Sequence, residues 1–132
     1  MTISVLVVDD DADLRRGLRA LLEVHGLEVL DAGTLREADA LARLYEPALL
    51  VVDGVLPDGN GIEWISILRS EGMATEVIFM SNILAKGRWL GVLGKLGVRH
   101  RINKRETPLE RIAEIVVQSM PLKGQHRIGD DP

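Results

Sequence analysis

Hydrophobic residues in this chain occur in short, nearly uninterrupted runs. Three of these runs, at residues 3–8, 48–52 and 77–80, are strongly apolar. Continuous rather than alternating runs of this length are typical of strands buried on both faces, as in a parallel sheet covered by helices. Two weaker runs, at residues 28–32 and 98–103, are shorter or more polar and suit edge strands. The pattern therefore predicts three central strands and two edge strands.

Apolar residues recur at helical spacing between these runs, and local signals mark several helix ends. The first helix can end at Gly26, and capping boxes at residues 34–37 and 107–110 predict the starts of the second and last helices. The later box has Pro108 at the first helical position, where proline is favoured. Glycines weaken the fourth helix, residues 84–96, by about 1 kcal/mol each relative to alanine. The apolar helical positions are Leu14, Leu18, Leu21, Leu22, Ala38, Leu41, Ala42, Tyr45, Ile62, Ile65, Leu68, Leu109, Ile112, Ala113, Val116 and Val117.

Strands and helices alternate along the whole pattern. Because crossovers between parallel strands are right-handed, this order predicts an α/β fold, a doubly wound five-stranded parallel sheet with helices on both faces. A chain of 132 residues fits about one domain, which we expect to cover residues 1–120. Residues 121–132 are polar and lack periodicity, so we expect a tail or the start of a linker there.

Composition excludes several classes of protein. The chain has no cysteine, which excludes a disulfide framework and a cysteine-based metal site. No apolar run approaches the ~18 residues of a membrane helix, and no basic region precedes the first run as in a signal peptide. We therefore expect a cytoplasmic protein without a membrane partner.

Charge is distributed unevenly along the chain. The net charge is −4, yet residues 77–105 contain seven lysines and arginines and no acid, so the rest of the chain carries −11. This basic stretch either forms a solvated surface that partly balances an acidic site or docks an acidic partner. Direct binding to nucleic acid is disfavoured, because the chain has no recognition motif and only 3% aromatic residues.

Chemically active side chains follow four of the predicted strands. Asp9, Asp10 and Asp11 come after the first strand, Asp53 and Ser81 end the third and fourth, and Lys104 follows the fifth. Open α/β sheets bind ligands at the carboxyl edge, where these groups would meet. Carboxylates, a hydroxyl and an ammonium at one edge indicate a divalent cation and a phosphoryl group.

The clustered carboxylates need compensation. Two unit charges about 5 Å apart repel by roughly 3 kcal/mol at an effective dielectric constant near 20. Mg²⁺ (or Mn²⁺) would offset this repulsion with oxygen ligands, and the Asp53 carboxylate could then attack phosphorus. Each group also has a simpler reading: the acidic triplet and Ser81 could cap helices, and Lys104 could be a solvated lysine. Capping accounts for Asp11 in any case, but not for Asp53 with Lys104.

Residues 3–119 resemble the receiver domain of bacterial two-component response regulators. The family's acidic pair corresponds to Asp9 and Asp10, and its phosphoacceptor strand to Val51-Val52-Asp53, followed by Leu56-Pro57 and Gly61. Ser81 holds the position of the switch Ser or Thr, and Gly97-Val98 with Lys104 resemble the last strand and its lysine. The resemblance implies a flavodoxin-like receiver fold with strand order 2-1-3-4-5.

The same resemblance implies a function. Asp53 would accept a phosphoryl group from a sensor histidine kinase or a phosphotransfer protein. Asp10, Asp53 and the Val55 carbonyl would ligate Mg²⁺, with Asp9 acting through water. Lys104 would contact the phosphoryl group. Ser81 would move toward it and alter the surface formed by the fourth helix, fifth strand and fifth helix.

Five positions depart from the family or tune its chemistry. Arg105 replaces a proline that often follows a cis bond, so we expect a trans bond and a less certain reach for Lys104. Arg101 replaces the switch aromatic residue and cannot bury in an apolar slot as a ring does. Asn82 could narrow access for the phosphodonor. Val55 and Ile83 are apolar and cannot orient water, so we expect a long-lived phosphorylated form, unless they only pack locally.

Other functions stay open. The leading reading is a switch that catalyses its own phosphorylation and has no separate turnover substrate. A degenerate receiver would act as a phosphorylation-independent interaction module. A Mg²⁺-dependent phosphohydrolase ranks lower, because Gly54 and Val55 supply no second acid. An acidic first loop would repel a flavin phosphate. The resemblance leaves open a C-terminal output domain and a homodimer through the fourth helix, fifth strand and fifth helix.

Overall fold

Five parallel strands form the centre of the structure, a computed structural model that describes residues 3–82 and 88–121. The strand order is β2-β1-β3-β6-β7, which places β2 and β7 at the edges, as predicted. Strands β4, Val55–Leu56, and β5, Gly59–Asn60, form a separate hairpin. When the five strands of the main sheet are counted without them, the order is the expected 2-1-3-4-5. The bounds are β1 Val5–Val8, β2 Val29–Ala32, β3 Leu49–Asp53, β6 Glu76–Ser81 and β7 His100–Asn103.

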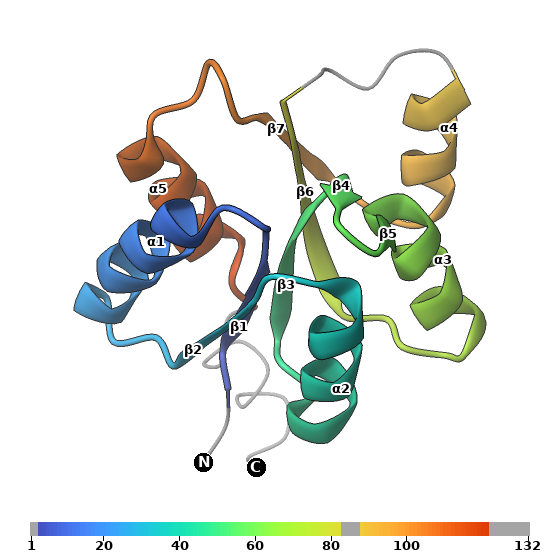
Figure 1. Ribbon diagram of the computed structural model, residues 1–132, viewed down its shortest axis with the longest axis horizontal. Coiled ribbons are helices and arrows are strands. Elements are labelled where there is room, and N and C mark those ends of the chain that lie inside the picture. Colours follow the sequence, from blue (N-terminus) through green and yellow to red (C-terminus); the bar gives the residue numbers. More distant parts are fainter. Residues whose placement is uncertain (1–2, 83–87, 122–132) are drawn as a thin grey trace, which may run out of the picture.

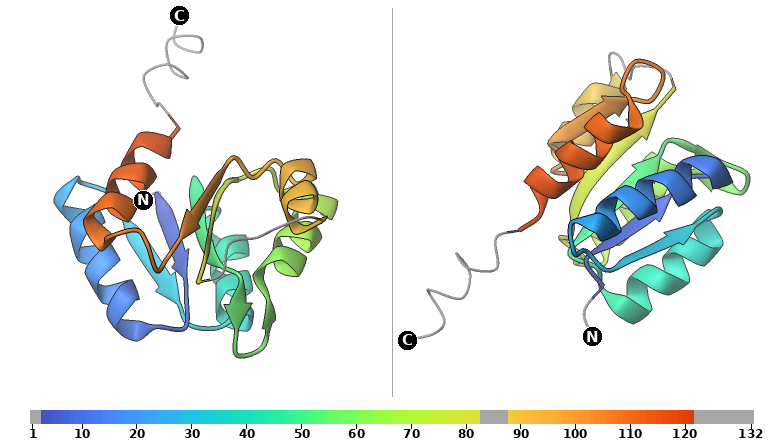
Figure 2. Two further views of the ribbon diagram at one scale, coloured as in Figure 1. Left: turned by 90° about the horizontal axis from the view of Figure 1, so that it is seen from above. Right: turned by 90° about the vertical axis from the view of Figure 1, so that its left-hand side faces the viewer.

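Helices cover both faces of the sheet (Figures 1 and 2). Helices α1 and α5 lie side by side on one face, and α2, α3 and α4 cover the other. Every residue of β1 and β3 is buried between these layers, which explains why their apolar runs are continuous. The bounds are α1 Ala12–Val24, α2 Leu35–Tyr45, α3 Gly61–Ser70, α4 Arg88–Lys95 and α5 Leu109–Ser119.

Two hydrophobic cores lie on opposite sides of the sheet. Alternate residues of β1 enter different cores: Leu6 and Val8 pack toward α2 and α3, whereas Val5 and Val7 pack toward α1 and α5. This is the two-residue period of a strand. Burying one such side chain fully contributes about 1.5–3 kcal/mol, so the two cores together fix the register of the central strands.

Side-chain caps at the starts of α1 and α2 agree with the predictions. Asp11 caps α1, accepting hydrogen bonds from the backbone N–H groups of Asp13 (3.0 Å) and Leu14 (3.1 Å). At α2 the Thr34 hydroxyl accepts from the Glu37 N–H at 3.2 Å. The Glu37 carboxylate accepts from the Gly33 N–H at 3.0 Å, one residue earlier than in a standard capping box.

The predicted start of the last helix needs correction, whereas the predicted fourth helix lies partly outside the described residues. The capping box at residues 107–110 is wrong, because α5 begins at Leu109 with Pro108 as its cap residue and without a side-chain cap hydrogen bond. Pro108 has an extended ψ of 151°, so it lies outside the helix, and its carbonyl accepts from the N–H groups of Arg111 and Ile112. Helix α4 is described only from Arg88, because residues 83–87 lie outside the described part of the chain.

A small hairpin follows Asp53 and was not predicted from the sequence. Strands β4, Val55–Leu56, and β5, Gly59–Asn60, pair antiparallel. At the hairpin tip the Asp58 carboxylate accepts from the backbone N–H groups of Leu35 (2.8 Å) and Arg36 (3.0 Å), at the start of α2. The hairpin that follows Asp53 is thereby tied to a helix more than twenty residues away in the sequence.

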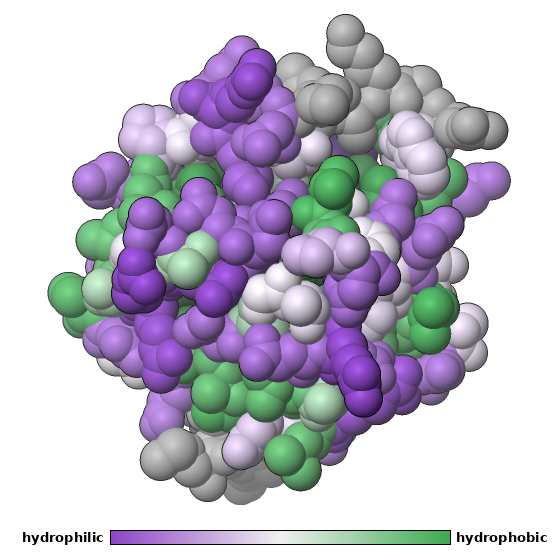
Figure 3. Space-filling model, in the orientation of Figure 1, coloured by the Kyte–Doolittle hydropathy of each residue, from purple (hydrophilic) through white to green (hydrophobic). Residues whose placement is uncertain are grey.

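Hydrophilic residues cover much of the visible surface, and hydrophobic ones appear in separate groups between them (Figure 3). Among the described residues, no helix combines the length and apolar character that crossing a membrane requires.

Candidate functional site

Three aspartates meet at the carboxyl edge of the sheet. Asp53 is the last residue of β3, and Asp9 and Asp10 directly follow the neighbouring strand β1. One carboxylate oxygen from each lies within 4.8 Å of the others. Asp9 is fully buried and Asp53 is 6% exposed, whereas Asp10 is exposed. The cluster is therefore closed on the protein side and open to solvent at Asp10.

Lys104 reaches this cluster from the end of β7. Its Nζ lies 2.6 Å from Asp9 Oδ2 and donates to Asp53 Oδ2 at 3.3 Å. Its own N–H donates to the Ser81 carbonyl at 2.8 Å, which fixes the lysine backbone against β6. The described chain has no cis peptide bond, so the bond before Arg105 is trans, as expected. The reach of Lys104 is nevertheless sufficient.

Burial and charge shift the protonation equilibria of this group. Burial raises the pKa of Asp53, and the negative charge of Asp9 adds to the increase, while Lys104 opposes it only in part. Burial lowers the pKa of Lys104, but the attraction of Asp9 and Asp53 outweighs burial, and the pKa lies above its usual value. Lys104 is thus charged at neutral pH, and its ammonium contacts two of the three clustered carboxyl groups.

The residues fit a hard divalent cation. Asp9 Oδ1 accepts a hydrogen bond from the Asp11 N–H at 2.9 Å. Asp9 Oδ2 is buried without a well-directed hydrogen bond from the described residues, although the ammonium of Lys104 lies beside it. Carboxylate oxygens with one side open to water are the environment that Mg²⁺ prefers. The acidic cluster is therefore consistent with magnesium binding.

Ser81 and Asn82 lie at the neighbouring strand end. Ser81, half-buried, is the last residue of β6 and pairs with Asn103 of β7. Asn82 follows it and is exposed, so its side chain lies at the surface beside the predicted site.

Val55 and Arg101, two other residues predicted to affect the switch, are exposed at the periphery of the site. Val55 has a 75% exposed side chain, and its N–H makes a long contact of 3.5 Å with Asp53 Oδ1. Arg101 is exposed on the edge strand β7, beside Phe79 of β6, so it does not fill an apolar slot. Ile83 lies outside the described residues.

Arg15 contacts the site and was not predicted from the sequence. Its Nη1 donates to the backbone carbonyl of Asp9 at 2.7 Å, and its Nε donates to Asp31 Oδ1 at 2.9 Å. An arginine in the first helix is not distinctive, because Arg16 and Arg19 lie nearby in the sequence. Only the acid in the second strand, Asp31, could have indicated a partner for it.

The sequence of the chain is similar to those of known transcriptional regulatory proteins. The chain is 42% identical over 78 residues to the KDP operon transcriptional regulatory protein KdpE of Escherichia coli, covering 59% of this chain and 34% of that one. It is 29% identical over 114 residues to the phosphate regulon transcriptional regulatory protein PhoB of Pseudomonas aeruginosa, covering 85% and 49%. The chain thus spans between a third and a half of the length of these two relatives.

Structural similarity leads to the same family. The structure of a CheY-like response regulator receiver domain protein from Methanospirillum hungatei matches with a TM-score of 0.75 and 26% identity, covering 89% of this chain and 96% of that one. A family model for the response regulator receiver domain matches residues 5–116. Together with the acidic cluster and its lysine at the sheet edge, these matches show that the chain belongs to the response regulator receiver domains.

Proposed function

We propose that Asp53 is the phosphoacceptor of this receiver and takes its phosphoryl group from a phosphohistidine on a sensor histidine kinase or a phosphotransfer protein. One observation carries the proposal: the Asp53 carboxylate ends a fully buried strand, with Lys104 Nζ at 3.3 Å and two more carboxylates around it. A nucleophile on such a strand is held in place, while Asp10 leaves one side of the cluster accessible.

The transfer is a displacement at phosphorus. An Asp53 carboxylate oxygen forms the new P–O bond, the P–N bond breaks, and its electron pair and a proton end on the donor imidazole. The Lys104 ammonium stabilises the phosphoryl oxygens as charge develops on them. Asp10, Asp53 and the Val55 carbonyl would hold Mg²⁺, with Asp9 acting through water, and the bound ion would offset charge on the same oxygens.

Ser81 couples the reaction to the rest of the molecule in this proposal. Its hydroxyl would donate a hydrogen bond to the phosphoryl group, and its carbonyl already accepts from the Lys104 N–H. A shift of Ser81 would therefore alter β7 and, through it, the surface formed by α4, β7 and α5. Since Arg101 is exposed, this switch would work without burying an aromatic ring.

The phosphorylated form should be long-lived. Val55 is exposed but apolar, so its side chain cannot orient a hydrolytic water by hydrogen bonding. Ile83 would act in the same way, and Asn82 would limit access to the site. Release of phosphate, followed in Mg²⁺ after the donor is removed, measures this lifetime; a half-life of seconds would contradict the proposal.

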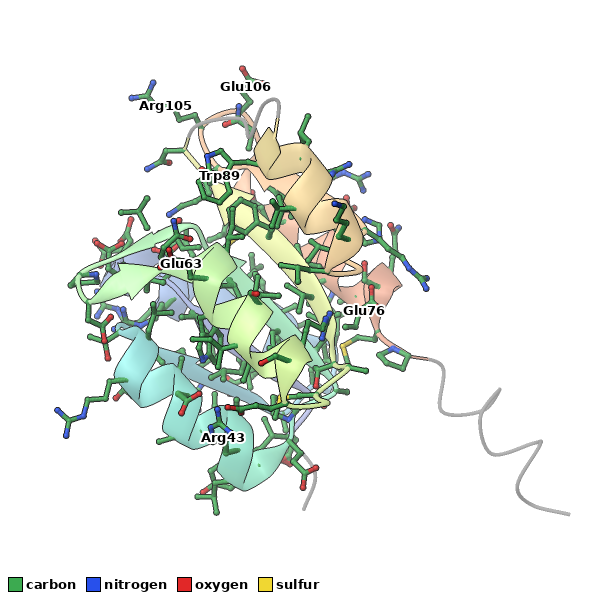
Figure 4. All side chains as sticks on the ribbon, turned by 90° about the vertical axis from the view of Figure 1, so that its right-hand side faces the viewer. Arg43, Glu63, Glu76, Trp89, Arg105 and Glu106 are labelled. Atoms are coloured by element: carbon green, nitrogen blue, oxygen red, sulfur yellow. The ribbon has the colours of Figure 1, made fainter. Side chains whose placement is uncertain are left out.

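Exposed basic side chains lie on and next to α4 and β7, on the surface where we propose that a partner docks. Four cations, Lys95, Arg99, Arg101 and Arg105, are exposed and form no ion pair with the described residues. Figure 4 shows Arg105 pointing away from the body of the molecule. We infer that an acidic surface of the kinase, or of an output domain joined beyond the receiver of residues 1–120, docks here. A symmetric homodimer through this face would bring like charges together.

Intact-protein mass spectrometry tests the proposed function. After incubation with Mg²⁺ and phosphoramidate, the protein should gain one phosphoryl group, and Asp53→Asn should gain none. Asp58→Asn, a matched change at a neighbouring exposed aspartate, should still be phosphorylated. Failure of the wild type with phosphoramidate and with acetyl phosphate, together with no Mg²⁺ binding, would favour an interaction module that works without phosphorylation.

A further inference from the structure

We propose that Arg15 is a positioning residue for the cation-binding carboxylates, because it holds the peptide group between Asp9 and Asp10. The inference rests on the proposed function, in which this cluster binds Mg²⁺. Arg15 touches neither the phosphoryl group nor the ion in this view. It acts through the backbone, by fixing the direction in which the chain leaves β1.

The two peptide groups that flank Asp9 are each held by one hydrogen bond. The Asp9 N–H donates to the Ala32 carbonyl at 3.0 Å, and the Asp9 carbonyl accepts from Arg15 Nη1 at 2.7 Å. The Asp9 carbonyl and the Asp10 N–H belong to one planar peptide group. Fixing the carbonyl therefore fixes the orientation of the bond that leads into Asp10.

Asp10 depends on this backbone support. Within the described chain, no donor hydrogen-bonds to its carboxylate and no cation pairs with it. By contrast, Asp9 is held by the Asp11 N–H and Lys104, and Asp53 is held by Lys104. Asp10 is thus the member of the cluster whose position is set by its backbone alone.

Arg15 is itself held rigidly. Its Nε donates to Asp31 Oδ1 at 2.9 Å, and the other oxygen of Asp31 accepts from Arg19 Nη1 at 3.0 Å. Its guanidinium also lies against the backbone at Gly33. A Cβ at that position would come within 2.9 Å of Nη1 and 3.4 Å of the guanidinium carbon, so a methyl group there would require this end of the Arg15 side chain to shift.

Position and charge predict opposite effects of removing Arg15. If its positive charge were the main influence, neutralising it would leave a more negative cluster and tighten Mg²⁺ binding. If positioning dominates, any change that breaks the contact with Asp9 weakens binding, whatever the charge. Groups that orient metal ligands typically contribute at least about tenfold in affinity.

Three substitutions separate these effects. Arg15→Gln removes the charge, Arg15→Lys keeps it without the forked geometry, and Gly33→Ala displaces the guanidinium without changing any charge. We expect all three to raise the Mg²⁺ dissociation constant, measured by isothermal titration calorimetry, by about tenfold. The rate of phosphorylation by phosphoramidate should return to within about twofold of wild type at saturating Mg²⁺, a recovery that a general folding defect would not allow.

A control comes from the same helix. Arg16→Gln removes the charge of an exposed neighbour that pairs with Asp13 and leaves the contact of Arg15 with Asp9 in place. This variant should bind Mg²⁺ as the wild type does. Unchanged Mg²⁺ affinity in Arg15→Lys and Gly33→Ala, or tighter Mg²⁺ binding in Arg15→Gln, would overturn this inference but leave the proposed function standing. Absence of Mg²⁺ binding by the wild type would overturn the proposed function and, with it, this inference.

Discussion

Asp53 and Asp58 lie five positions apart in opposite environments. Asp53 is buried beside other carboxylates, and burial, followed by the charge of Asp9, raises its pKa. Asp58 is exposed at the hairpin tip, and the backbone N–H groups of Leu35 and Arg36 lower its pKa. Ionisation of Asp53 therefore opposes folding, whereas ionisation of Asp58 supports it.

Asp53→Asn should stabilise the protein at neutral pH. Because the pKa of Asp53 is raised in the folded state, its protonated form adds to the free energy of unfolding. This contribution is fully present below the ordinary aspartate pKa of about 3.9 and is lost as pH rises through the folded value. The asparagine variant avoids this loss, and we expect a gain of about 1 kcal/mol at pH 7. Urea unfolding in EDTA measures it, and the gain should shrink as pH falls toward about 4. A variant less stable than wild type at pH 7 would show that the Lys104 ion pair dominates.

Asp58→Ala should have the opposite effect. A lowered pKa means that the stabilisation is present above the ordinary aspartate pKa and is lost as pH falls through the folded value. We expect a lower melting temperature at neutral pH, because the start of α2 loses two hydrogen bonds to the Asp58 carboxylate. The difference from wild type should fade in acid. A pH-independent difference would mean that the carboxylate charge is not involved.

Glycines in two helices should respond in opposite ways to the same substitution. A Cβ at Gly61, the first residue of α3, would lie 2.1 Å from the Asp53 backbone oxygen. At Gly91, within α4, it would meet no atom within 4 Å. The first glycine is required by close approach to the end of β3, while the second has only the entropic cost of glycine in a helix.

Gly61→Ala should therefore destabilise the protein by about 3 kcal/mol, at the upper end for overpacking. It should also slow phosphorylation at Asp53, because the clash falls on that residue's carbonyl. Gly91→Ala should stabilise by up to about 1 kcal/mol and leave phosphorylation unchanged. Chemical denaturation measures the stability of each variant, and an assay with phosphoramidate measures its rate of phosphorylation. Equal stabilities of the two variants would contradict the close packing of α3 on β3.

The elements also show how far the sequence could predict the structure. The buried strands were predictable because β1 and β3 are apolar throughout, and their order along the chain placed Asp9 and Asp53 at one edge. The hairpin of β4 and β5 was missed, since strands of two residues show no periodicity. The contacts of Asp58 with α2 and of Arg15 with Asp9 were missed because they depend on tertiary packing.

At the scale of the whole molecule, the acidic cluster lowers stability unless a cation is present. If Mg²⁺ occupies the site as proposed, it binds the folded state, in which the three carboxylates are together, and it should raise the melting temperature as its concentration increases. At a hundred times the dissociation constant the gain is about 2.7 kcal/mol. Differential scanning calorimetry with and without EDTA measures it. Asp10→Asn should lose most of the gain, and an equal response in that variant would place the ion elsewhere.

Two adjacent carbonyls of β6 connect this strand to both sides of the site. Met80 accepts from the Gly54 N–H at 3.0 Å, and Ser81 accepts from the Lys104 N–H at 2.8 Å. These two amide hydrogens therefore report by deuterium exchange how often each side of the site opens. If phosphorylation moves Ser81, exchange at Lys104 changes while exchange at Gly54, bonded to the preceding carbonyl, stays slow. The same strand thus provides both a signal and an internal reference for following the switch in solution.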